Sequence, residues 1–169
     1  WFGNKHSKIA FNNLENNKYS SVILDLSTGN KSVYDMALYD ISKDSSYALC
    51  IDHERHHWVR RGYSYDGISN HKKRGNIIKD DGIYKLCFIN KTISKIIDIA
   101  DLLNIKPIKS MSQASHYVEH IMISPSGRRF AFLHRCSPVR LNANNIHILC
   151  GHFHYCCLSP KPLAIIITD

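Results

Sequence analysis

The sequence has few glycines, and their arrangement excludes several classes of enzyme. Eight glycines are scattered through 169 residues. None of them forms GxGxxG or GxxxxGK[ST], the loops that hold dinucleotide and nucleotide phosphates. The Gly-x-Ser-x-Gly turn of α/β-hydrolases is also missing. No apolar run reaches the roughly 18 residues of a membrane-spanning helix, so we expect no membrane span.

Cysteine is present but lacks the spacing of a secreted disulfide framework. Cys50 and Cys87 lie inside apolar runs, where a thiol behaves as a small buried hydrophobe. The other four crowd into the C-terminal part: Cys136, Cys150, Cys156 and Cys157. Because no regular pairing pattern appears, the cysteines favour a reducing compartment such as the cytoplasm.

Acidic residues are outnumbered by basic ones. The chain has 22 Lys and Arg against 14 Asp and Glu, a formal net charge of +8. Such a balance suits an anionic partner, for example an acidic glycan, although many basic proteins have no such partner. Neither a recognition helix nor an RNP-type sheet is recognisable, so we expect no nucleic-acid partner.

One short pattern occurs twice and indicates a repeated strand–turn–strand unit. "ISKDSSYALCI" (residues 41–51) aligns with "ISPSGRRFAFL" (residues 123–133). Ser124 to Gly127 fits a type I turn, with proline second and glycine fourth. The apolar runs that follow do not alternate with polar residues, as in strands covered on both faces. A third copy, "KIAF" (residues 8–11), lacks the turn before it.

Hairpins lie between the copies of this pattern. "SSVILDLSTGNKSVYDM" (residues 20–36) and "GIYKLCFINKTISKIIDI" (residues 82–99) each predict strand, turn, strand. Together with the repeated pattern they predict a four-stranded antiparallel unit that recurs along the chain. The excess length falls in two predicted insertions, at about residues 53–80 and 100–118.

The repeated pattern resembles a known family of repeats. "ISPSGRRFAF" is similar to the "SPDGKRIAF" signature of WD40-like, TolB-type (PD40) β-propeller repeats. The resemblance implies an all-β fold in which residues 1–135 form a propeller fragment. That fragment would hold the last three strands of one blade, one complete blade, and the first two strands of another.

A longer run is similar to a segment of the oligogalacturonate lyase propellers. The run is "HYVEHIMISPSGRRFAFLHR" (residues 116–135). The resemblance implies that His120 binds a divalent metal, manganese, and that His134 is the second histidine of the site, near the substrate. Arg135 stands where that family has an acidic residue, so the resemblance is incomplete there.

The first insertion carries the residues best suited to binding. Arg60 and Arg61 can form a fork around a carboxylate, and Tyr63 or Tyr65 can stack on a sugar ring. "RRGYSY" is also similar to an Arg-Pro-Gly-Tyr-Gly-Tyr element of propellers associated with polysaccharide loci. The alternative is a solvated basic loop whose aromatic side chains pack back on the blade.

"HYVEH" offers a second group of polar side chains. On a strand, His116 and His120 share one face and Glu119 lies on the other. A strand-end histidine can bind a metal, whereas a hydrogen-bonded structural histidine is the commoner outcome.

The tail, residues 136–169, differs in composition from the rest. It is poor in charge and rich in histidine and cysteine, and we expect no hairpin after Arg135. We hypothesise that the reading frame shifts near Cys136. If the frame is genuine, the crowded histidines and cysteines become candidate zinc ligands, although their spacing is unusual.

Two functions from different classes follow. The first is a non-catalytic propeller that binds acidic carbohydrate or another protein, linked to surface polysaccharide metabolism. The alternative is a metal-dependent polysaccharide lyase acting on acidic oligosaccharides. A fold of this kind hosts many functions, so the fold alone does not choose between them.

Overall fold

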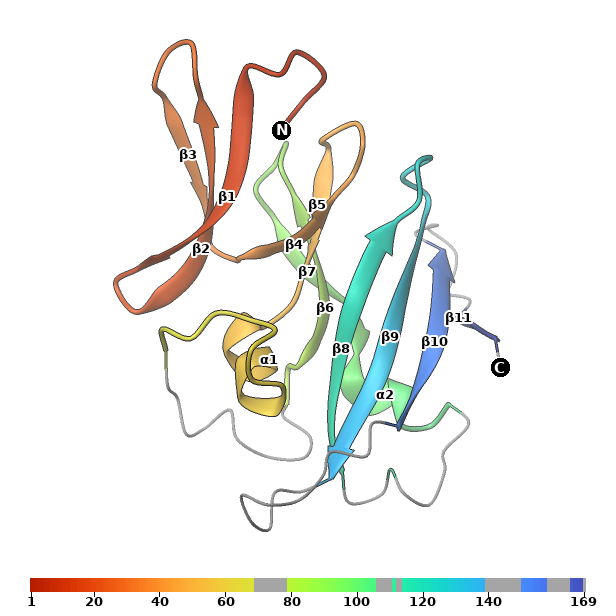
Figure 1. The fold of residues 1–169 in the computed structure, drawn as a ribbon. Coiled ribbons are helices and arrows are strands. Elements are labelled where there is room, and N and C mark those ends of the chain that lie inside the picture. The colour runs from red at the N-terminus through yellow and green to blue at the C-terminus, as the bar shows by residue number, and fades with distance from the viewer. Residues whose placement is uncertain (69–78, 106–110, 112–113, 139–149, 158–164, 169) are drawn as a thin grey trace.

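The computed structural model describes residues 1–68, 79–105, 111, 114–138, 150–157 and 165–168. Antiparallel strands form three consecutive sheets (Figure 1). The first holds β1 (Lys8–Glu15), β2 (Lys18–Asp25) and β3 (Lys31–Tyr34). The second holds β4 (Leu38–Ile41), β5 (Tyr47–Cys50), β6 (Gly82–Cys87) and β7 (Ile93–Asp98). The third holds β8 (Ala114–Ile123), β9 (Arg129–Pro138), β10 (Cys150–Cys157) and β11 (Ile165–Thr168).

The repeated strand–turn–strand unit is confirmed by its backbone hydrogen bonds. Ser42 N donates to Tyr47 O at 3.0 Å, and Ser124 N donates to Arg129 O at 2.8 Å. Inside each turn the serine carbonyl also accepts from the residue three positions on, Ser45 or Gly127, at 2.8 Å. The two turns, one in each four-stranded sheet, therefore share one backbone design.

The predicted hairpins are also confirmed. β2 pairs with β3, and β6 pairs with β7, at the positions that the sequence indicates. Equivalent bonds close both hairpins, since Asp25 N donates to Asn30 O and Cys87 N donates to Thr92 O, each at 2.9 Å. Before the third copy of the pattern (residues 8–11), the chain pairs with β1 at one position only, where Phe2 forms an isolated antiparallel bridge with Lys8.

The third sheet is larger than the sequence predicts. We expected two strands there and no hairpin after Arg135, but β9 pairs with β10 and β10 pairs with β11. β9 also continues through Cys136 to Pro138, across the boundary predicted between the propeller fragment and the tail. The frameshift hypothesis stays a prediction.

The cysteines of the described residues differ in their bonding. Cys50 and Cys87 are free thiols, whereas Cys136 is disulfide-bonded. Disulfide bonds persist mainly in oxidising compartments. The compartment of the protein stays a prediction.

The main apolar core lies between the second and third sheets. Its fully buried members include Leu49 and Ile83 of the second sheet and Phe130 and Phe132 of the third. A smaller core cluster joins the first and second sheets through Ile23, Tyr34, Leu38 and Phe88. No helix among the described residues is long and apolar enough to cross a membrane.

The described parts of both connections leave the sheets at the same end. Strands alternate in direction, so the connections β5–β6 and β7–β8 leave from the end opposite the short turns. Each connection starts with a helix, α1 (His53–Val59) or α2 (Ile99–Leu102), and both are at the lower end in Figure 1. From the sequence we expect the first insertion to be a loop, whereas the structure shows that it begins with helix α1.

Candidate functional site

Helix α1 begins at a capping aspartate. Asp52 precedes the helix, and its carboxylate accepts from the backbone N–H groups of Glu54 and Arg55, both at 3.1 Å. An aspartate in this position satisfies amides that have no partner within the first helical turn. This cap fixes where the chain leaves β5 and turns back across the end of the sheets.

Arg55 holds α1 against the sheets. Its side chain is almost fully buried, and Nε lies 3.3 Å from a carboxylate oxygen of Asp81. The guanidinium also donates to the backbone carbonyl of His116 at 3.3 Å and lies over the Trp58 ring. Burial raises the pKa of Asp81 to about 6, although Arg55 acts in the opposite direction.

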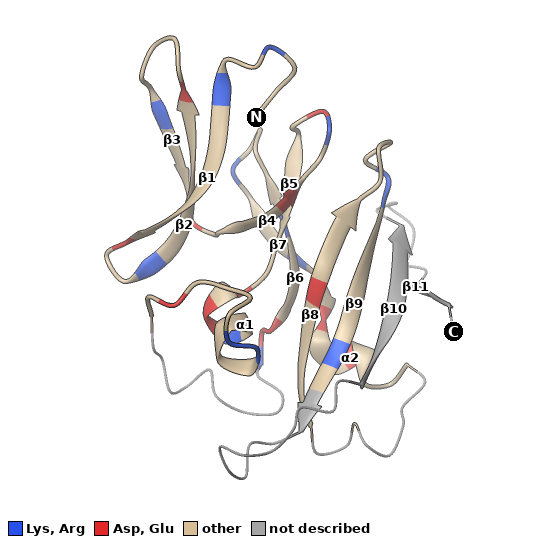
Figure 2. Ribbon diagram, viewed as in Figure 1, with Lys and Arg blue, Asp and Glu red and all other residues tan. Residues whose placement is uncertain are grey.

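Glu119 is the centre of a charged cluster that joins α1, β8 and β9. Its side chain is only 2% exposed, with Arg135 Nε at 2.8 Å and Arg60 Nε at 3.3 Å from its oxygens. His56 Nε2 of α1 lies 3.6 Å away. Figure 2 shows the acidic segment of β8 beside a basic segment of β9. Two arginines therefore contact one buried carboxylate.

These neighbours decide the protonation state of Glu119. Burial alone would raise the pKa of its carboxyl group. The contact with His56 and the charges of Arg60 and Arg135 outweigh burial, so the pKa lies below its ordinary value. The carboxylate is ionised at neutral pH and is a weak base.

His120 and His116 do not share a face, so that prediction is wrong. The pairing of β8 with β9 shifts register between Glu119 and Met122, and His120 has a left-handed φ of 51°. This β-bulge turns the His120 side chain to solvent and leaves His116 buried, with Glu119 also buried. The His120 backbone N–H donates to the Tyr39 hydroxyl of β4 at 2.7 Å.

His134 lies inside the protein. Its Nε2 is 3.0 Å from His116 Nδ1, and His116 Nε2 is 2.8 Å from the Met111 carbonyl. A carbonyl only accepts, so His116 Nε2 carries the hydrogen, and His134 Nε2 then donates to His116 Nδ1. Burial lowers the pKa of His116. The structure does not bring His134 to the surface, where a ligand would meet it.

Three of the predicted binding residues of the first insertion, Arg60, Arg61 and Tyr63, follow α1 directly and differ in their surroundings. Arg60 is engaged by Glu119 and by the Tyr117 hydroxyl at 3.3 Å, and its guanidinium lies 3.9 Å from the centre of the Tyr63 ring. Arg61 is exposed, and Tyr63 is 63% exposed. Arg60 thus positions Tyr63, while Arg61 is the cation that faces solvent.

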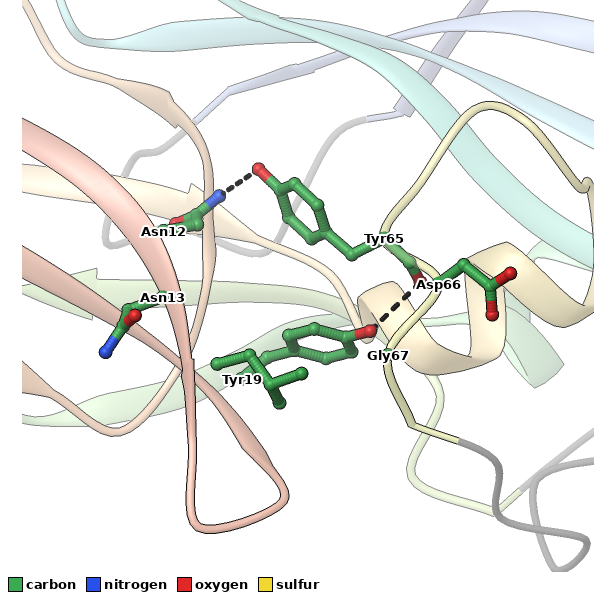
Figure 3. Close-up of a pocket in the computed structure, with 7 residues that line it drawn as sticks. Asn12, Asn13, Tyr19, Tyr65, Asp66 and Gly67 are labelled. Atoms are coloured by element: carbon green, nitrogen blue, oxygen red, sulfur yellow. Dashed lines mark hydrogen bonds between the residues drawn. The ribbon is translucent and has the colours of Figure 1, made fainter.

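Tyr65 forms part of a cavity with a volume of about 260 Å³. Its hydroxyl accepts from Asn12 Nδ2 at 2.8 Å, and its backbone carbonyl accepts from the Tyr19 hydroxyl at 3.0 Å (Figure 3). The cavity lies between β1, β2 and the segment after α1, and its lining is Asn12, Asn13, Leu14, Tyr19, Tyr65, Asp66 and Gly67.

The described residues do not fit a manganese ion at His120. No group of three or more His, Cys, Asp or Glu side chains within the described ranges could hold a metal. The nearest carboxylate, Glu119 at 3.5 Å, is in contact with Arg135. The tail positions considered for zinc lie outside the residues whose side chains the structure describes.

Comparisons with known proteins do not identify a family. No family model, curated protein or solved structure matches the chain. The function is therefore argued from the site itself.

Sequence reasoning named Glu119 and Arg135 but did not predict that they pair and organise the site. Arg60, which follows α1, is far from Glu119 in the chain, whereas Glu119 and Arg135 lie on the consecutive strands β8 and β9. One signal was available, because Arg135 replaces the acidic residue expected beside His134. An arginine there needs a nearby anion if it is partly buried, and Glu119 lies on the paired strand.

Proposed function

We propose that the protein is a β-propeller that binds an acidic carbohydrate without chemistry, in surface polysaccharide metabolism. The shared hydrogen bonds of the turns at Ser42 and Ser124 support the repeat. The first strands of the two four-stranded sheets are also neighbours, since Asp40 of β4 accepts from the Ile123 backbone N–H of β8 at 2.7 Å. Blades arranged around a centre place their first strands in this way.

One observation carries the binding proposal. The segment after α1 is held at both ends, by Arg60 on Glu119 and by Tyr65 on Asn12, and between them it exposes Arg61 and Tyr63. A binding segment that is ordered before the ligand arrives loses less conformational entropy on binding. A cation beside an exposed tyrosine ring is suited to a uronate, whose carboxylate pairs with arginine and whose ring stacks on an aromatic face.

The lowered pKa and the ion pairs of the Glu119 carboxylate favour a role in binding over a role in proton abstraction. A general base should have a pKa near the operating pH. The pKa of Glu119 is lowered, and two arginines occupy its carboxylate. This carboxylate therefore acts as a structural anchor for the segment that carries Arg61.

The test is retention of the protein on immobilised polygalacturonate. We expect the native protein to be retained, and Arg61→Ala to bind about tenfold more weakly, as for the loss of one bond to a charged group. Arg128→Ala is the matched control, because Arg128 is also exposed but lies in the turn at the other end of β8. Equal retention of native protein and Arg61→Ala would contradict the proposal.

The lyase alternative is a second proposal, and the observation in its favour is His120. Its backbone has a left-handed φ, and its imidazole is exposed beside Glu119. Strained residues of this kind occur at functional sites. The other metal ligands would come from outside the described residues. Manganese that binds the native protein but not His120→Ala, with release of unsaturated uronate, would favour this alternative, and equal binding to both would exclude it.

A further inference from the structure

We infer that the cavity beside Tyr65 holds one uncharged sugar ring, next to the acidic unit that Arg61 binds. The inference rests on the proposed function and extends it to a substrate class. The ligand would be an acidic polysaccharide in which a neutral sugar accompanies the uronate. Tyr65 and Arg61 belong to the same short segment, so the two units would belong to one oligosaccharide.

The charge of the cavity lining indicates a neutral unit. No lysine or arginine is among the described residues that line it, and the Asp66 carboxylate, whose side chain is 85% exposed, lies 3.4 Å from His57 Nε2. The described lining therefore offers the carboxylate of a uronate no lysine or arginine to pair with. Figure 3 shows the Asp66 carboxylate directed away from Asn12, Asn13 and Tyr19, so the asparagine amides are the groups that would meet the hydroxyl groups of an uncharged ring.

The shape and chemistry of the walls suit a sugar. The Tyr65 ring and the Leu14 side chain are each about two-fifths exposed and form an apolar wall for the C–H face of a ring. Asn13 adds an amide that can both donate and accept. The Tyr65 hydroxyl accepts from Asn12, so its own hydrogen can be donated to a ligand.

The cavity is held in place before any ligand arrives. The Asn12 amide bonds to the backbone N–H and carbonyl of Leu38, at 2.6 and 2.8 Å, and to Tyr65. Gly67 packs so closely on Leu14 that a Cβ at this position would overlap the leucine side chain. Asn12 is therefore a positioning residue, and Gly67 lets the segment approach β1.

Saturation-transfer difference NMR on the full chain tests the inference. The probes are the methyl glycosides of glucose, galactose and mannose, with trigalacturonate as the acidic probe. Leu14→Trp fills the cavity from a partly exposed position. Leu26→Trp is the matched control, because Leu26 is an exposed leucine after β2 that does not line the cavity.

We expect at least one neutral glycoside to bind the native protein and Leu26→Trp, and to bind Leu14→Trp about tenfold more weakly. Equal binding to Leu14→Trp would overturn the inference. Binding of trigalacturonate without any neutral glycoside would overturn it too, but would leave the proposed function standing. If neither probe binds, the inference and the proposed function both fail.

Discussion

Replacing Glu119 by glutamine tests how the binding segment is held. The substitution keeps the shape of the side chain but removes the negative charge that Arg60 and Arg135 share. Breaking a buried ion pair by removing one partner costs about 3–5 kcal/mol. The arginine side chains keep 15% and 22% exposure, so water can partly reach them. We therefore expect a loss of about 3 kcal/mol, at the lower end of that range.

The assay is urea unfolding followed by circular dichroism, with the free energy of unfolding taken from the linear dependence on urea. Glu15→Gln is the matched control, because Glu15 is exposed at the end of β1 and its replacement should change stability by less than about 0.5 kcal/mol. Arg135→Met in the Glu119→Gln background should cost little more. If Glu119→Gln is as stable as Glu15→Gln, the cluster does not anchor the segment.

Three further results follow from buried or strained residues. Burial and the nearby His56 lower the pKa of His53 to about 4; because the unfolded chain binds this proton near pH 6.5, the native protein should lose up to about 3 kcal/mol of stability relative to His53→Gln as the pH drops from there towards 4, whereas protonation of Asp81, whose pKa burial raises to about 6, acts in the opposite direction in both proteins. Arg55→Met should cost about 3–5 kcal/mol near pH 8 and less near pH 5, where Asp81 is protonated, as urea titrations at both pH values would show. Gly127→Ala should reduce the free energy of unfolding by about 1–2 kcal/mol because φ is 67°, and Gly127→Asn should reduce it less, as thermal melts of both variants would show. The same pH dependence for the native protein and His53→Gln, equal losses for Arg55→Met at both pH values, or equal melting of the two Gly127 variants would contradict the respective arguments.

The parts of the fold that sequence predicted depend on local chemistry. The hairpins follow from turn residues between apolar runs, and the repeated turn follows from Ser124 to Gly127 and its counterpart at Ser42. Each of these turns is specified by neighbouring residues alone. Helix α1 has only seven residues, too short for apolar periodicity to reveal it, although the Asp52 cap is a signal that could have been used.

The parts that sequence did not predict depend on distant contacts. The β-bulge after Glu119 separates the faces of His116 and His120, and nothing in the period-two pattern of β8 shows it. Arg60 looked like a free ligand for an anion, but Glu119 and Tyr117 of β8 occupy it. Arg61, Tyr63 and Tyr65 of the segment are exposed, and their role in binding stays a prediction.

The most direct test of the central claim is calorimetric titration of trigalacturonate into the native protein and into the double variant Arg61→Ala/Tyr63→Ala. Both side chains are exposed, so the variant should fold normally and keep its circular dichroism spectrum. The account predicts measurable binding to the native protein and a loss of at least about tenfold in the variant. Binding of the same strength to both proteins would show that the carbohydrate site, if present, is elsewhere.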